Sequence, residues 1–62
     1  MTIYDKVKEL ATKKNLSIAA VEAKADVANG TISGWRNGRP YADTLRKVAR
    51  VLEVPIEELL GE

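Results

Sequence analysis

The chain has 62 residues, enough for one domain with a thin core and too few for two. It contains neither cysteine nor histidine, so disulfides, thiolate zinc sites and histidine chemistry are excluded. The formal charge is +1, but the first 52 residues hold ten bases and five acids, whereas the four acids from Glu53 onward have no base among them. A basic body with an acidic tail is a partial footprint of nucleic-acid binding, and solvated helix faces account for it equally well.

The first predicted element is a helix over residues 3–14, because apolar side chains recur there at positions 3, 7, 10 and 11. Thr2 and Asp5 form an acidic variant of a capping box at its start, and Asn15 suits the left-handed position after its end. Apolar and charged residues alternate from the start of the chain, unlike a signal peptide, and no apolar run reaches the roughly 20 residues of a membrane span. We therefore expect a soluble, cytoplasmic protein with no membrane partner.

A short second helix begins after Ser17, a good N-cap, and ends near residues 24–26. A third helix is predicted over about residues 28–37, closed by Asn37 and Gly38. A fourth covers residues 42–53, and Pro55 precedes a last short helix over residues 56–60. The fold class predicted for residues 1–62 is an all-α single domain, a compact bundle of five short helices.

Residues 17–38 have the layout of a helix-turn-helix, in which the first helix braces the second and the second enters the major groove of DNA. In the second helix, Ala28, Ile32 and Trp35 form the predicted buried side. Two exposed glycines cost a helix about 1 kcal/mol each relative to alanine, so we interpret the opposite side as a face that lies close to base edges. A strained helix start at Gly30 and room for a neighbouring helix at Gly34 are the competing explanations. The exposed face is small and neutral, and it consists of Gly30, Ser33, Gly34 and Asn37, with Asn29 at its edge.

A specific pattern of residues crosses the centre of the chain: Leu16-Ser17, then VANGTISGW over residues 27–35, then Asn37-Gly38. TLRKVA over residues 44–49, LEV over residues 52–54 and EELL over residues 57–60 extend it. On these residues the chain resembles the Cro/phage-repressor (XRE-type) helix-turn-helix family over about residues 4–60. The resemblance implies a five-helix, lambda-repressor-like domain that binds operator DNA, commonly as a dimer.

The resemblance also implies which residues meet DNA. The base-reading positions of the recognition helix correspond to Asn29, Gly30, Ser33 and Gly34. The phosphate-contacting positions correspond to Ser17 and Ile18 at the start of the bracing helix, then to Thr31, Arg36, Asn37, Arg39 and Tyr41. Asparagine pairs bidentately with adenine and serine bonds to several bases, whereas the glycines would permit close approach. Position 18 is often a phosphate-binding glutamine in the family, and isoleucine cannot take that role.

Three further departures from the family pattern affect this surface. Asp26 stands where the turn usually has glycine, so we expect a strained or repositioned turn. Arg36 replaces a common glutamate, and Ala11 stands where that glutamate's arginine partner would be. We therefore expect Arg36 either to be free for a phosphate or to pair with Glu22. Tyr41 stands at a helix N-cap, where either its hydroxyl reaches the backbone or its ring is partly buried.

One domain of this size makes few contacts, so we expect a homodimer on a near-palindromic operator with half-sites about one helical turn (~34 Å) apart. Val51, Leu59 and Leu60 are apolar residues that either form a symmetric contact between copies or pack within the chain.

The expected function is sequence-specific binding of double-stranded DNA by a transcriptional regulator, a phage- or prophage-type repressor. The alternative is a protein-interaction module, as the antitoxin of a toxin–antitoxin pair or an antirepressor. An enzyme is not expected, because Ser17 and Ser33 have no histidine to activate them, and the chain lacks a glycine-rich phosphate loop and a metal-ligand cluster. The sequence implies no cofactor, metal or small-molecule ligand.

Overall fold

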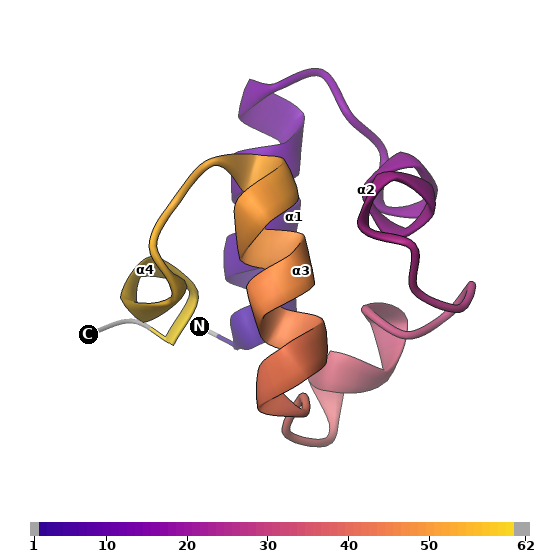
Figure 1. The fold of residues 1–62 in the computed structure, drawn as a ribbon, viewed down its shortest axis with the longest axis vertical. Helices are drawn as coiled ribbons and strands as arrows, with labels where there is room; N and C mark the ends of the chain where they lie inside the picture. Colours follow the sequence, from indigo (N-terminus) through magenta and orange to yellow (C-terminus); the bar gives the residue numbers. More distant parts are fainter. Residues whose placement is uncertain (1, 61–62) are drawn as a thin grey trace.

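The computed structural model describes residues 2–60, which form helices and turns without any strand (Figure 1). Four α-helices follow one another along the chain: α1 at Ile3–Lys13, α2 at Ile18–Ala25, α3 at Ala42–Leu52 and α4 at Ile56–Leu60. A short 3₁₀ helix, η1, lies between α2 and α3 at Ser33–Arg36. The all-α class is confirmed, but the count of five α-helices is wrong, because the third predicted helix is replaced by η1 and the turns before it. Within residues 2–60, no helix combines the length and the apolar character needed to cross a bilayer.

The helices are arranged around α1 and α3. In Figure 1, α3 lies in front of α1, and α2 and α4 are seen nearly end-on at opposite sides. α3 packs against α2 and α4, whereas α1 packs against α2, α4 and η1. A contact between Tyr4 and Arg36 places η1 at the N-terminal end of α1. The segment between α2 and α3 is therefore attached to the body of the domain through α1.

One hydrophobic core joins all of these elements. The side of α1 that faces the core is centred on Tyr4, Val7 and Ala11. It is rotated slightly from the apolar face predicted for this helix, so Ile3 and Leu10 are only partly buried. Burying apolar surface contributes roughly 25 cal/mol per Å² and is the main source of stability in a small domain that has no disulfide. The buried apolar residues are Tyr4, Val7, Ala11, Val21, Ala25, Ile32, Trp35, Leu45, Val48, Ala49, Leu52 and Leu59.

Side-chain caps begin α1 and α2 as the sequence predicts. The Asp5 N–H donates to Thr2 Oγ1 and the Thr2 N–H donates to Asp5 Oδ2, both at 3.1 Å, which completes the capping box. These bonds to Thr2 stabilise the carboxylate and lower the pKa of Asp5 from its ordinary value of 3.8. At α2, the Ala20 N–H donates to Ser17 Oγ at 3.0 Å. The N-caps of both helices are therefore confirmed.

Three helices end on a residue that is left-handed but is not glycine. Asn15, Asp26 and Glu53 each have φ 59° and follow α1, α2 and α3 respectively. The next residue in each case donates its N–H to a carbonyl five positions back, and the three pairs are Leu16 to Ala11 at 2.8 Å, Val27 to Glu22 at 3.1 Å and Val54 to Ala49 at 3.1 Å. This is the Schellman arrangement, which usually has glycine at the left-handed position. The left-handed cap predicted at Asn15 is confirmed, and the departure at Asp26 is accommodated by the same backbone turn.

Candidate nucleic-acid interface

Residues 29–37, here called the recognition segment, do not form the regular helix that the sequence predicts over residues 28–37. Gly30 has φ +92°, outside the helical region, and the 3₁₀ helix begins only at Ser33. The N–H groups of Thr31 and Trp35 donate to carbonyls three residues earlier, whereas the Gly34 N–H donates to Gly30 O, four residues earlier, at 3.1 Å. Glycine and β-branched residues propagate a helix poorly, so this segment stays a series of tight turns.

The recognition segment has a buried side and an exposed side. Ile32 is fully buried and Trp35 is 6% exposed, as predicted. Ala28, predicted to be buried with them, is exposed, because it lies before the helical turn and the helical spacing does not apply to it. Val27 packs against the core from this part of the chain instead. The residues predicted to face DNA bases are all exposed, and they are Asn29, Gly30, Ser33 and Gly34. Asn37, on the same predicted face, is exposed as well.

The two glycines of this face have different explanations. The positive φ of Gly30 supports the strained start that the sequence allows for, since L side chains rarely adopt that conformation. Gly34 is different: a Cβ built there meets no atom within 4 Å, so it does not make room for a neighbouring helix. The packing of residues 2–60 therefore gives no reason for the missing side chain at Gly34.

A buried carboxylate that the sequence analysis did not identify as an anchor holds the start of this segment. Glu22 is 3% exposed, and its Oε2 accepts hydrogen bonds from the N–H of Gly30 at 3.1 Å and the N–H of Ile32 at 2.9 Å. The signal was present in the sequence, because Glu22 lies four residues after Ile18 and three before Ala25, on the inward side of α2. A buried acid requires hydrogen-bond donors, and here the backbone supplies them.

Arg36 does not pair with Glu22; the residue is exposed and its guanidinium contacts Tyr4. It lies over the ring of Tyr4, 4.3 Å from the ring centroid, and its Nη2 donates to Tyr4 Oη at 2.9 Å. Tyr4 is 8% exposed and belongs to the core, so the end of the recognition segment is fastened to α1. The expected pairing with Glu22 is therefore wrong, and the contact found in its place joins residues 32 positions apart in the chain.

The residues predicted to meet phosphates are not equally available. The Ser17 hydroxyl accepts the capping bond of α2, and Ile18 and Thr31 are partly buried. Asn37 and Arg39 are exposed. Tyr41 is 85% exposed and makes no capping hydrogen bond, so both expectations for it, a hydroxyl cap and a partly buried ring, are wrong.

The ion pairs between described residues involve α1, α3 and α4. Two of them bring the acidic tail onto α1 and its C-cap residue: Lys14 Nζ lies 2.8 Å from Glu53 Oε1, and Lys6 Nζ lies 3.9 Å from Glu58 Oε1. The hydrogen bond and the charge of Lys14 lower the pKa of Glu53 from its ordinary value of 4.5. The other pairs are Lys6–Glu9, Lys13–Glu9 and Asp43–Arg46. Within residues 2–60, no carboxylate pairs with Lys24 or Arg39, so the cations that flank the recognition segment keep their charge available.

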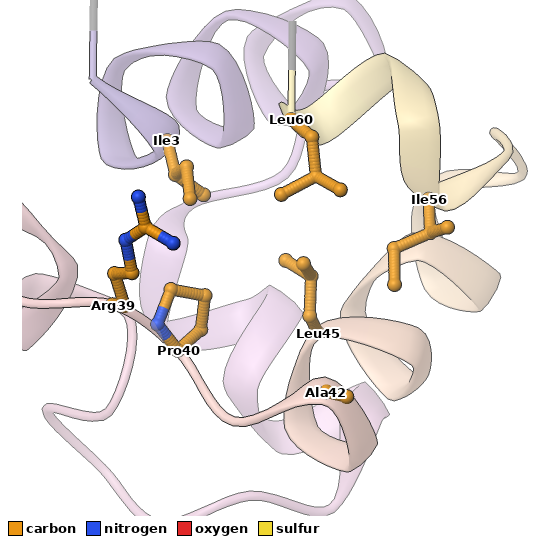
Figure 2. A pocket seen from close by; sticks show the side chains of 7 residues that line it. All are labelled: Ile3, Arg39, Pro40, Ala42, Leu45, Ile56 and Leu60. Carbon is orange, nitrogen blue, oxygen red and sulfur yellow. The ribbon is translucent and has the colours of Figure 1, made fainter. Parts of the chain in front are cut away.

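A groove of about 430 Å³ lies beside this surface (Figure 2). Figure 2 shows the Leu60 side chain facing Leu45 across the groove, with the Arg39 guanidinium at one end. No member of the recognition segment lines it, so the groove is separate from the surface predicted to read bases. The lining residues are Ile3, Arg39, Pro40, Ala42, Leu45, Ile56 and Leu60.

Comparison with known protein families identifies the class. A family model described as helix-turn-helix matches residues 7–59, most of the chain. The protein therefore belongs to the helix-turn-helix family, of the Cro/XRE type that its residue pattern indicates. It is a DNA-binding transcription regulator of that type. No curated protein and no solved structure matches the chain significantly.

Proposed function

We propose that the protein binds double-stranded DNA sequence-specifically through the recognition segment and acts as a phage- or prophage-type repressor. One observation carries the proposal: the exposed face of the segment is small and neutral, although the core holds the other side through Ile32 and Trp35. Gly34 is the strongest part of it, since its open Cβ position is explained by a close approach from outside the chain. A duplex groove is the partner for which such a slender face is suited.

Sequence choice rests on few side chains in this proposal. Asn29 pairs with adenine through its amide, and Ser33 donates to or accepts from base edges. Gly30 and Gly34 present backbone only, so they act by allowing the segment to approach the bases. The exposed Asn29 and Ser33 make no side-chain hydrogen bond to other described residues, which leaves their polar groups available for bases.

Affinity comes from cations and donors beside the recognition segment. Arg39 and Tyr41 are the strongest candidates for phosphate contacts on grounds of exposure, and Asn37 is exposed as well. At the start of α2, the backbone N–H groups next to Ser17 and Ile18 offer a further phosphate site. Each contact made by a cation contributes about 0.9 to the slope of log affinity against log salt.

We also propose that two copies bind together on a near-palindromic operator. The domain measures 23 × 21 × 18 Å between Cα extremes, smaller than one helical turn of DNA (~34 Å), so one copy covers one half-site. Of the three apolar residues considered for a contact between copies, Leu59 is buried in the core and Val51 is partly buried against it. Leu60 is 44% exposed and is the residue we assign to this contact. Leu60→Glu should lower operator affinity by more than the accompanying decrease in the stability of the domain accounts for, since Leu60 also lines the groove beside Leu45.

The proposal is tested by selection from a library of duplexes with a random central window, followed by a salt titration on the enriched duplex. We expect one enriched near-palindromic sequence whose affinity falls steeply with salt. Arg39→Ala should weaken binding to the enriched duplex and to a mixed-sequence duplex by similar factors, because phosphates carry no sequence information. The absence of any enriched sequence at low ionic strength would contradict the proposal.

A further inference from the structure

The recognition segment makes few hydrogen bonds of its own, and its position depends on two side chains from other elements. The residue before η1, Ile32, has no side-chain cap, and the last turn closes with a long bond of 3.4 Å from the Asn37 N–H to Gly34 O. A segment of this kind frays unless its ends are fixed by tertiary contacts. Such contacts exist at both ends, and they come from α2 and α1.

At the start of the segment, the contact is made by Glu22. One carboxylate oxygen accepts the N–H groups of Gly30 and Ile32, so it fixes the turn in which Gly30 adopts its positive φ. No cation pairs with Glu22 within residues 2–60, although the side chain is almost fully buried. The backbone N–H groups of the recognition segment are therefore the main partners of the Glu22 carboxylate. The carboxylate needs these donors because it is buried, and the segment needs the carboxylate to hold its first turn.

At the end of the segment, the contact is made by Arg36. Its guanidinium is held by the ring face of Tyr4 and by a hydrogen bond to the same residue's hydroxyl. A planar guanidinium can do both at once because it stacks and donates in a fixed geometry, which a lysine ammonium does not reproduce. Arg36 as a residue remains exposed, but its guanidinium is held against Tyr4 both by stacking and by the Nη2 hydrogen bond.

We propose that Arg36 and Glu22 are positioning residues, which hold the two ends of the recognition segment in the geometry that fits DNA while touching neither bases nor phosphates. The inference rests on the proposed DNA-binding function and reassigns one residue within it. Arg36, which the family resemblance puts among the phosphate contacts, acts through Tyr4 instead. Arg39, three residues later and free of any such contact, is the cation that meets the phosphate.

Salt titration of a matched pair of variants separates the two roles. Arg36→Met and Arg39→Met each remove one positive charge, and both are measured against the duplex enriched by the wild-type protein. We expect Arg39→Met to lower the slope of log affinity against log salt by about 0.9, the value for one phosphate contact. Arg36→Met should lower the affinity about tenfold with no change in slope, since the loss of a charge-assisted anchor is comparable to that of one strong hydrogen bond.

Milder variants keep the test decisive if Arg36→Met lowers the stability of the domain. Tyr4→Phe removes only the hydroxyl and leaves the ring, so operator affinity should fall about fivefold with the slope unchanged. In the double variant, adding Tyr4→Phe to Arg36→Met should lower operator affinity almost no further, because the Tyr4 hydroxyl has already lost Arg36 as its partner. Glu22→Gln should speed amide hydrogen exchange at Ile32 and lower the ratio of operator affinity to mixed-sequence affinity.

The outcomes distinguish this inference from the proposed function. A slope that falls by about 0.9 in Arg36→Met would show that Arg36 meets a phosphate and would overturn the positioning role. Unchanged operator affinity in both Tyr4→Phe and Glu22→Gln would also overturn it. If wild-type protein selects no duplex at all, the proposed function itself fails. Thermal melts of each variant in the absence of DNA show whether a change in affinity reflects a loss of fold.

Discussion

Helix α3 and the recognition segment follow one another along the chain and have opposite characters. α3 buries Leu45, Val48, Ala49 and Leu52 on one side and exposes charged residues on the other, so its sequence is explained by its own fold. The recognition segment also buries two large apolar residues, but its exposed side has glycines and short polar side chains where α3 has lysine and arginine. This contrast is expected if α3 serves packing alone and the exposed side of the recognition segment serves the proposed contact with DNA.

The two regions also differ in how they are held. α3 is an unbroken helix of 11 residues whose backbone bonds are internal. The recognition segment is a set of turns that depends on Ile32 and Trp35 beneath it and on Glu22 and Tyr4 at its ends. The variants below test that difference in order of expected effect.

The largest effect is expected where the recognition segment enters the core. Ile32→Ala removes a side chain with no exposed surface and should lower the free energy of unfolding by about 3 kcal/mol or more. Ile3→Ala, the same change at a partly buried position of α1, is the matched control and should lower the free energy of unfolding clearly less. Urea denaturation measures both. Equal losses would mean that the segment is not anchored more firmly than the edge of the core.

The next largest effect is expected on binding alone. Ser33→Glu puts a negative charge on the exposed side of the segment, where phosphate repulsion should lower operator affinity about 100-fold or more. Thr12→Glu adds the same charge on the exposed side of α1 and should have little effect. Fluorescence anisotropy with the enriched duplex compares the two variants. Similar losses from both would place the DNA-binding surface elsewhere.

A smaller but more specific effect is expected at Gly34. The Cβ of Gly34→Ala meets no atom within 4 Å, so the change should raise the free energy of unfolding by about 0.5–1 kcal/mol. The same methyl group should lower operator affinity about tenfold if the segment lies against bases, an overpacking cost of a little over 1 kcal/mol. Gly38→Ala, whose Cβ makes only an ordinary contact with Gly34 O at 3.8 Å, is the control. Tighter binding by Gly34→Ala would contradict the close approach.

The smallest effect concerns pH and involves the helical body alone. The pKa of Asp5 and the pKa of Glu53 are both lowered in the folded chain, so their contribution to stability is complete above the ordinary values of 3.8 and 4.5. It is lost as the pH falls through the folded-state values. The thermal midpoint should therefore decrease on acidification, and Asp5→Asn and Glu53→Gln should each make that decrease shallower. Both residues are exposed, so the decrease in the thermal midpoint is modest.

Most of the helical body is predictable from the sequence, and the recognition segment is only partly so. The spacing of apolar residues predicts α1, α3 and α4 to within a residue, because long amphipathic patterns and caps act locally. The prediction of a helix over residues 28–37 is wrong because two effects oppose each other. Ile32 and Trp35 have helical spacing, but Gly30 and Gly34 lower the helix propensity of the segment.

The anchors of the recognition segment are the least predictable part of the site. Arg36 and Tyr4 are joined across 32 positions, and nothing in the neighbourhood of either residue identifies the other as its partner. Glu22 is intermediate, because its place on the inward side of α2 indicates a buried acid but not which N–H groups it binds. The exposed face itself was predicted correctly, since small polar residues opposite buried apolar ones can be recognised from the pattern alone.

The left-handed residues that close three helices have a consequence for the evolution and engineering of this domain. Each L residue in that conformation carries a conformational penalty of roughly 1 kcal/mol, which is smallest for asparagine and aspartate. Asn15, Asp26 and Glu53 lie on the surface, outside the recognition segment. Glycine at Asn15 or Asp26 would relieve part of that penalty without loss of a side-chain hydrogen bond or ion pair found among residues 2–60, whereas Glu53 pairs with Lys14. The scaffold can thus be made more stable, and more tolerant of substitutions that alter DNA specificity, at positions outside the recognition segment.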